Sequence, residues 1–132
     1  MEIIGLEGIW QCEIPGQTAP MRIPGTLDES GIGGPDDPAR QWKAEELRSR
    51  GFRREGDPIL TRLTRLHAWE GPARISRIFD WDVPEGLRVF AEVERARQLH
   101  LTVNGREAPL VEPGCLSVPW VFEVTGDRKS VV

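Results

Sequence analysis

Two pairs of acidic residues have a spacing that brings carboxylates together on a β-strand. Asp80 and Asp82 form one pair and Glu92 and Glu94 the other, and residues two apart point to the same face of a strand. A retaining glycosidase uses two carboxylates about 5 Å apart and an inverting one uses a separation of about 6.5–9.5 Å. Each pair here alternates with apolar residues and so lies on the solvated face of its strand. We therefore expect neither pair to be catalytic.

Residues that commonly bind zinc are few. Cys12, Cys115, His67 and His100 are the soft ligands of the chain, and no Cys-x-x-Cys motif joins them. We expect the two cysteines to be small apolar residues rather than metal ligands or a disulfide framework.

Other motifs for cofactors and nucleophiles are also incomplete. The acidic residues at 28–29 and 36–37 lack the spacing of a calcium loop, and the glycines at 31–34 lack the Lys-Ser/Thr of a phosphate-binding loop. No Gly-x-Ser-x-Gly elbow is present. The sequence therefore predicts no metal and no cofactor.

The length and charge of the chain limit the classes of protein to which it can belong. The 132 residues, 39% of them hydrophobic, are enough for one domain with its own core, which we place at residues 1–132. The net charge of −4 argues against nucleic acid as a partner, because such binding relies on neutralising phosphates. No run of 18 apolar residues predicts a membrane span. The first five residues lack the pattern of a signal peptide, and this leaves both a bacterial cytoplasmic and a periplasmic or secreted location open.

Apolar residues recur with a period of two in the regular parts of the chain, which is typical of half-buried antiparallel strands. Gly and Pro separate these runs, as in a sandwich or barrel rather than in βαβ units. Asn104-Gly105 predicts a two-residue type I′ hairpin. The alternating runs are Trp10, Cys12 and Ile14; Ile75, Phe79, Trp81 and Val83; Val89, Ala91 and Val93; Leu99, Leu101 and Val103; and Val118, Trp120, Phe122 and Val124.

A long excursion between residues 28 and 60 interrupts the strand pattern. It contains one expected short helix, with Asp37 as N-cap, Pro38 as the first helical residue and Gly51 just past the end. A connection of this length is usually functional or packs over one end of a sandwich.

Three groups of short motifs occur in a fixed order along nearly the whole chain. The motifs are Trp10-Gln11 and residues 23–28 (IPGTLD); residues 60–66 (LTRLTRL), residues 69–73 (WEGPA), Arg77 and Val83-Pro84; and residues 93–96 (VERA), 103–106 (VNGR), 116–119 (LSVP) and 122–126 (FEVTG). In that order and spacing they resemble the N-terminal sugar-binding domain of glycoside hydrolase family 2, the family of bacterial β-galactosidases and β-glucuronidases.

The resemblance implies an all-β, antiparallel jelly-roll β-sandwich of the galactose-binding-domain type. It also implies that the chain is a non-catalytic accessory domain within a larger enzyme that hydrolyses O-glycosyl bonds. Its expected partners are carbohydrate and the immunoglobulin-like and catalytic barrel domains of that enzyme. The two catalytic glutamates of such enzymes lie in the barrel, which about 250 residues form, so this chain alone is not expected to be an enzyme.

Five residues are candidates for sugar contacts or for the rim of a sugar-binding cleft. Each has a structural alternative: an ion pair that braces a loop for the three charged residues, a core plug for the tryptophan, and a turn residue with positive φ for the asparagine. The five are Arg62, Trp69, Glu70, Arg77 and Asn104. After Gly71-Pro72-Ala73 the chain has Arg74-Ile75 where the family usually carries aromatic residues.

Two further functions from other classes stay open on the sequence. One is a free-standing carbohydrate-binding module that holds a glycan through a surface tryptophan and polar loop groups. The other is a structural or interface domain with no ligand. A concave polar pocket favours the module, whereas exposed apolar surface favours a docked accessory or structural domain.

Overall fold

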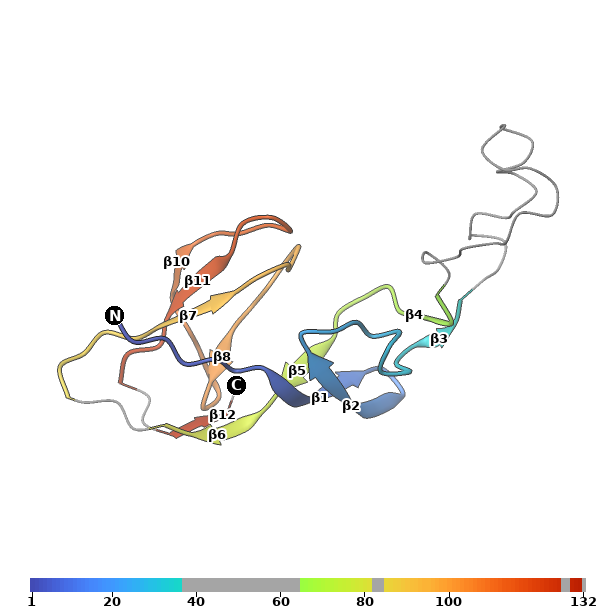
Figure 1. The fold of residues 1–132 in the computed structure, drawn as a ribbon, viewed down its shortest axis with the longest axis horizontal. Helices are drawn as coiled ribbons and strands as arrows, with labels where there is room; N and C mark the ends of the chain where they lie inside the picture. The colour runs from blue at the N-terminus through green and yellow to red at the C-terminus, as the bar shows by residue number, and fades with distance from the viewer. Residues whose placement is uncertain (37–64, 82–84, 127–128, 132) are drawn as a thin grey trace. The chain divides into compact units, whose positions relative to one another are not determined.

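The computed structural model describes residues 1–36, 65–81, 85–126 and 129–131 (Figure 1). The chain divides into two compact units, Met1–Arg74 and Ile75–Val132. All the regular secondary structure of the described residues is β-strand, and the described strand pairs are antiparallel.

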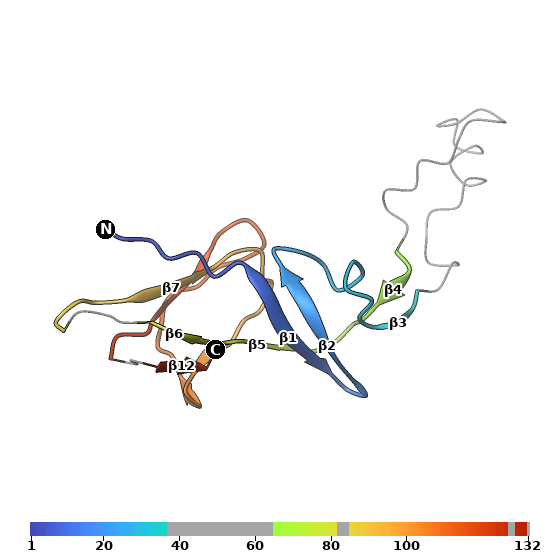
Figure 2. The ribbon, with the colours of Figure 1, turned by 60° about the horizontal axis from the view of Figure 1, so that its bottom comes forward.

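A hairpin forms the centre of the first unit. β1 (Gly8–Ile14) and β2 (Gln17–Ile23) pair in register from Gly8 opposite Ile23 to Ile14 opposite Gln17. They lie side by side in both ribbon views (Figure 1, Figure 2). Along β1 the buried residues alternate with exposed ones, as the sequence predicts for Trp10, Cys12 and Ile14.

β2 is an edge strand, and none of the alternating runs predicts it. The strand order is β2-β1-β5, and β5 (Arg74–Ser76) starts with the last residue of the unit. Pro20 lies opposite Gln11 in the middle of β2. Proline lacks the N–H that a central strand needs, so its place on an edge strand has a physical reason.

Two very short strands complete the described part of the first unit. β3 (Gly34–Pro35) pairs with β4 (His67–Ala68), with Gly34 opposite Ala68 and Pro35 opposite His67. These strands lie directly before and after the part of the chain that contains residues 37–64. The expected helix after Asp37 lies outside the described residues, and so does Arg62.

A three-stranded sheet organises the second unit. Its order is β10 (Leu110–Glu112), β11 (Trp120–Glu123) and β7 (Phe90–Val93). Opposite residues on β11 and β7 share a face, so Phe122 and Ala91 point to one side and Glu123 and Phe90 to the other.

Two smaller strand pairs belong to the same unit. β8 (Thr102–Val103) and β9 (Arg106–Glu107) are joined by Asn104 and Gly105, whose φ angles of 50° and 77° confirm the predicted hairpin turn. β6 (Ile78–Asp80) pairs with β12 (Lys129–Val131). The run predicted from Ile75 to Val83 is therefore divided between β5 and β6.

Each unit has its own apolar cluster. In the first unit Cys12, Ile14, Met21 and Ile32 are buried together, with Ala19, Leu27 and Trp69 packed against them. In the second, the buried residues are Leu101, Val103, Ala108, Phe122 and Val124. The buried positions at Leu101, Val103, Phe122 and Val124 confirm the predicted alternation, whereas Val118 is 51% exposed and does not follow it.

The described residues are thus all-β, with several antiparallel sheets over apolar clusters, an organisation consistent with a β-sandwich.

Candidate functional site

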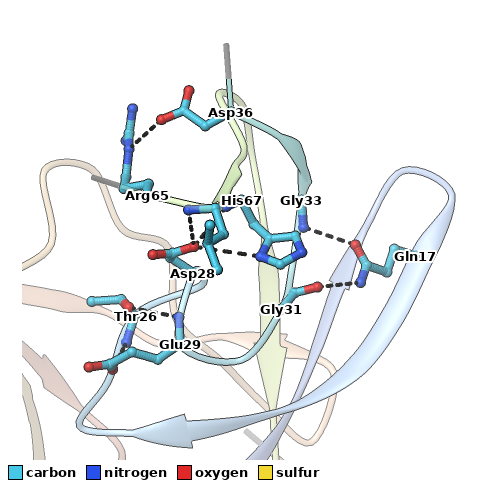
Figure 3. A network of polar contacts seen from close by, with 10 residues as sticks. Gln17, Thr26, Asp28, Glu29, Gly31, Gly33, Asp36, Arg65 and His67 are labelled. Atoms are coloured by element: carbon cyan, nitrogen blue, oxygen red, sulfur yellow. Dashed lines mark hydrogen bonds and ion pairs between the residues drawn. The ribbon is translucent and has the colours of Figure 1, made fainter. Parts of the chain in front are cut away.

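The first unit contains a network of polar contacts around the turn that follows β2 (Figure 3). The turn closes by a reciprocal exchange: Thr26 N donates to Glu29 Oε2 at 3.0 Å, and Glu29 N donates to Thr26 Oγ1 at 3.2 Å. This is the capping-box pattern, Thr-x-x-Glu, used here to close a single turn rather than to start a helix. It fixes the residues that precede and follow Asp28.

Asp28 clamps this turn to a segment distant in the sequence. Its Oδ1 accepts a hydrogen bond of 2.9 Å from Leu66 N and one of 2.7 Å from His67 N. Figure 3 shows the carboxylate pointing at the backbone of His67. One side chain of the 23–28 motif thus satisfies two backbone donors of the segment that leads to Trp69.

Gln17 makes a second attachment from the start of β2. Its amide donates to Gly31 O at 3.1 Å and accepts from Gly33 N at 2.9 Å. Both ends of the amide are used, so the loop at residues 31–33 is held against the hairpin.

Gly33 is required where the two segments meet. Its φ is +111°, and an added Cβ would collide with the carbonyl oxygen of Ala68. Only glycine allows both this conformation and this close approach of two backbones.

A third attachment lies at Asp36. Its backbone N donates to Leu66 O at 3.1 Å, and its Oδ2 accepts from Arg65 Nε, also at 3.1 Å. The Asp36 side chain is only 4% exposed, whereas that of Arg65 is 59% exposed. The residues on either side of the 37–64 segment are therefore tied to each other as well as to the hairpin.

The electrostatics of the network centre on Asp28. The hydrogen bond from the His67 backbone, together with that from Leu66, lowers the pKa of the Asp28 carboxyl because both favour its charged form. The carboxylate therefore remains ionised, and accepts its two backbone bonds, over the neutral pH range.

The ring of His67 lies beside the same carboxylate. Its Nδ1 lies 3.6 Å from Asp28 Oδ1, is buried, and has no hydrogen-bond partner among the described residues. The His67 side chain as a whole is 38% exposed. The arrangement orients an imidazole beside a carboxylate.

Trp69 has a packing role in the structure. It is partly buried against the cluster of Cys12 and Ile32, and its indole Nε1 donates to Pro72 O at 3.1 Å. Both features agree with the core-plug alternative for this tryptophan.

The other predicted site residues are distributed over both units. Glu70 is exposed in the first unit, while Arg77 is half-buried and Asn104 exposed in the second. Asn104 adopts the positive φ of its turn, as its structural alternative requires. Trp69 and Glu70 lie together because they are neighbours in the chain. A role in sugar contact stays a prediction for all five candidates, Arg62, Trp69, Glu70, Arg77 and Asn104.

The sequence did not predict that Asp28, Gln17 and His67 take part in this network of contacts. The reciprocal bonds between Thr26 and Glu29 were predictable, because the Thr-x-x-Glu spacing of a capping box is a local sequence pattern. The Asp28–His67 contact spans 39 residues, and no sequence period encodes it.

Comparisons with known proteins add no relative: no family model, curated protein or solved structure matches the chain. Among the described residues, no group of three or more His, Cys, Asp or Glu side chains is placed to hold a metal ion. The described part of the chain also has no helix of the length and apolarity needed to cross a membrane.

Proposed function

We propose that this chain is a non-catalytic, carbohydrate-facing accessory domain of a glycoside hydrolase similar to family 2. In this proposal its strands belong to a jelly-roll sandwich of the galactose-binding type. Its task is to position substrate hydroxyls at the rim of a cleft whose catalytic carboxylates lie in another domain.

The observation that carries the proposal is where the motif residues lie. Asp28, from the 23–28 motif, anchors the segment 66–67 directly before Trp69 and Glu70, which begin the 69–73 motif. Two motifs that are distant in the sequence are thus held next to each other. Contact between the 23–28 motif and the segment that leads to the 69–73 motif supports the resemblance to the family 2 domain better than either motif does alone.

The 103–106 motif fits the same interpretation. It forms the β8–β9 hairpin, and Asn104 lies exposed at its tip. A rigid two-residue turn with a polar amide is suited to hold a hydrogen-bonding group at a cleft rim, because little conformational entropy is lost when the ligand binds.

The first test is the native reading frame around residues 1–132. We expect it to encode an immunoglobulin-like segment and a barrel with two carboxylates. The full protein should then release nitrophenol from nitrophenyl β-glycosides, and the chain alone should release none.

Removal of residues 1–132 from the full protein supplies the sharper measurement. We expect kcat/KM for the glycoside to fall while the barrel remains folded. A frame without any barrel would contradict the proposal and favour the free-standing carbohydrate-binding module, whose test is a glycan array.

A further inference from the structure

The outer face of the β7–β11 pair carries an ordered cluster of side chains in the second unit. Arg88 donates from Nε and Nη2 to the two carboxylate oxygens of Glu123, at 3.1 and 3.0 Å. Thr125 Oγ1 donates to Glu123 Oε1 at 2.9 Å, and Val89 N donates to Thr125 Oγ1 at 3.1 Å. The pair is therefore bidentate, and Thr125 fixes its carboxylate end.

The Arg88 guanidinium lies over the ring of Phe90. The guanidinium carbon of Arg88 is 5.0 Å from the centroid of the Phe90 ring, and Phe90 is 45% exposed. The β7–β11 register places Phe90 directly opposite Glu123, on the face away from the buried Phe122. An apolar surface and a fixed polar pair thus adjoin each other on one side of the sheet.

The hydrogen-bonding groups that the Arg88–Glu123 pair leaves unused are adjacent and include both donors and acceptors. A guanidinium has five N–H donors, and two of those of Arg88 point at Glu123. The carboxylate of Glu123 accepts two bonds at Oε1 and one at Oε2, which leaves acceptor capacity on Oε2. Neighbouring donors and acceptors match the neighbouring hydroxyl groups of a sugar, each of which can donate and accept.

The charge of the cluster selects among ligands. The hydrogen bond from Arg88 lowers the pKa of Glu123, and that same bond raises the pKa of Arg88, so both groups stay ionised and compensate each other. An anionic ligand would have to compete with Glu123 for the guanidinium. A neutral ligand can use the remaining donors without breaking the pair.

We propose that Arg88, Phe90 and Glu123 form a binding site for a neutral pyranose sugar, with Thr125 positioning the Glu123 carboxylate. The C–H face of the sugar lies against the exposed part of the Phe90 ring that Arg88 does not cover, and its hydroxyls lie on the Arg88–Glu123 pair. The site rests on the proposed function in one respect, namely that the chain faces carbohydrate. It lies at none of the five residues singled out from the sequence.

The experiment is a titration of the ¹⁵N-labelled chain with methyl β-glucoside and methyl β-galactoside, followed by amide chemical shifts. A ligand of this size binds a shallow site with a Kd in about the millimolar range, so the titration extends to about 100 mM. We expect the amides of Arg88, Phe90, Glu123 and Thr125 to shift together. Methyl β-glucuronide, which is anionic, should bind more weakly than the glucoside.

Two variants and one control locate the site. Phe90→Ala removes the ring, and Arg88→Lys keeps the positive charge but removes the bidentate fork. Each should raise the Kd about tenfold, which is the effect of losing about 1.4 kcal/mol. Val111→Ala is the matched control, because Val111 is a similarly exposed apolar residue (46%) of the same unit on β10 and lies outside the cluster. The amide shifts of Leu101 and Val103 report whether each variant keeps its core.

Several outcomes would overturn the site. These are the absence of shifts in the cluster, shifts confined to other residues, an unchanged Kd in both variants, or tighter binding of the glucuronide than of the glucoside. None of these outcomes bears on the reading frame around residues 1–132, so a failure of this site and a failure of the proposed function are distinguishable.

Discussion

Asp28 Oδ1 lies 2.7 Å from the backbone N of His67, although the two residues are 39 positions apart in the chain. Together with the bond from Leu66 N, this contact makes Asp28 the residue that joins the turn after β2 to the segment before Trp69.

Replacement of Asp28 tests this connection. Asp28→Ala leaves the N–H groups of Leu66 and His67 without their acceptor, so we expect a lower urea midpoint. Asp28→Asn keeps an acceptor oxygen but loses the charge and should lower the midpoint less. Glu2→Gln, at an exposed position, is the control for a lost negative charge and should leave the midpoint unchanged. Equal midpoints for Asp28→Ala and the native chain would contradict the clamp.

The pH dependence of stability provides a second test of Asp28. Its pKa in the folded chain is below its ordinary value of 3.8, so its contribution is fully present above about pH 5 and is lost as the pH falls through the folded pKa. The difference in urea midpoint between the native chain and Asp28→Asn should shrink as the pH falls below about 5. Glu123 also has a lowered pKa, but it is present in both proteins and cancels in the difference. A difference that grows as the pH falls from about 5 to about 3 would contradict the assignment.

Substitution of two glycines by alanine distinguishes backbone strain from steric collision of the added Cβ. Gly16 and Gly33 both have positive φ, +80° and +111°, so Gly→Ala strains either one by about 1–3 kcal/mol. A Cβ on Gly16 meets nothing within 4 Å, whereas one on Gly33 collides with Ala68 O. We expect Gly33→Ala to lower the free energy of unfolding more than Gly16→Ala does, as measured by urea denaturation. Equal losses would show that the approach of Gly33 to Ala68 is not constrained.

Truncation of Ile32 tests the core of the first unit. Ile32 is fully buried among Cys12, Ile14 and Met21, so Ile32→Ala should lower the free energy of unfolding by about 2–5 kcal/mol. Ile9→Ala, at a position that is 59% exposed, should change it by less than about 0.5 kcal/mol. Thermal or urea unfolding of the two variants checks the contrast, and a loss at Ile32 no larger than that at Ile9 would contradict the burial.

The two cysteines should differ in reactivity. The Ser117 hydroxyl lies 3.5 Å from Cys115 Sγ and lowers the pKa of this exposed thiol, whereas burial raises the pKa of the Cys12 thiol. A thiol reagent at neutral pH should modify Cys115 rapidly and Cys12 only after unfolding. Ser117→Ala should slow the reaction of Cys115. Rapid modification of both thiols in the folded chain would contradict this assignment.

Sequence reasoning was most successful where the signal was local. Trp10, Cys12 and Ile14 alternate on β1 because successive side chains of a strand point to opposite faces, and Asn104-Gly105 forms its turn because both residues tolerate positive φ. It was less successful at β2, where Pro20 breaks the usual strand composition but is tolerated on an edge.

What the sequence by itself determined is therefore the all-β class, the alternation of the strands and the turn at Asn104. The tertiary structure decided which distant residues meet, such as Asp28 with His67 and Arg88 with Glu123 across 35 positions. The physical reason is that alternation and turn preference follow from the stereochemistry of neighbouring residues. A contact between distant residues forms only once strand pairing and core packing have offset the entropy of closing the chain between them.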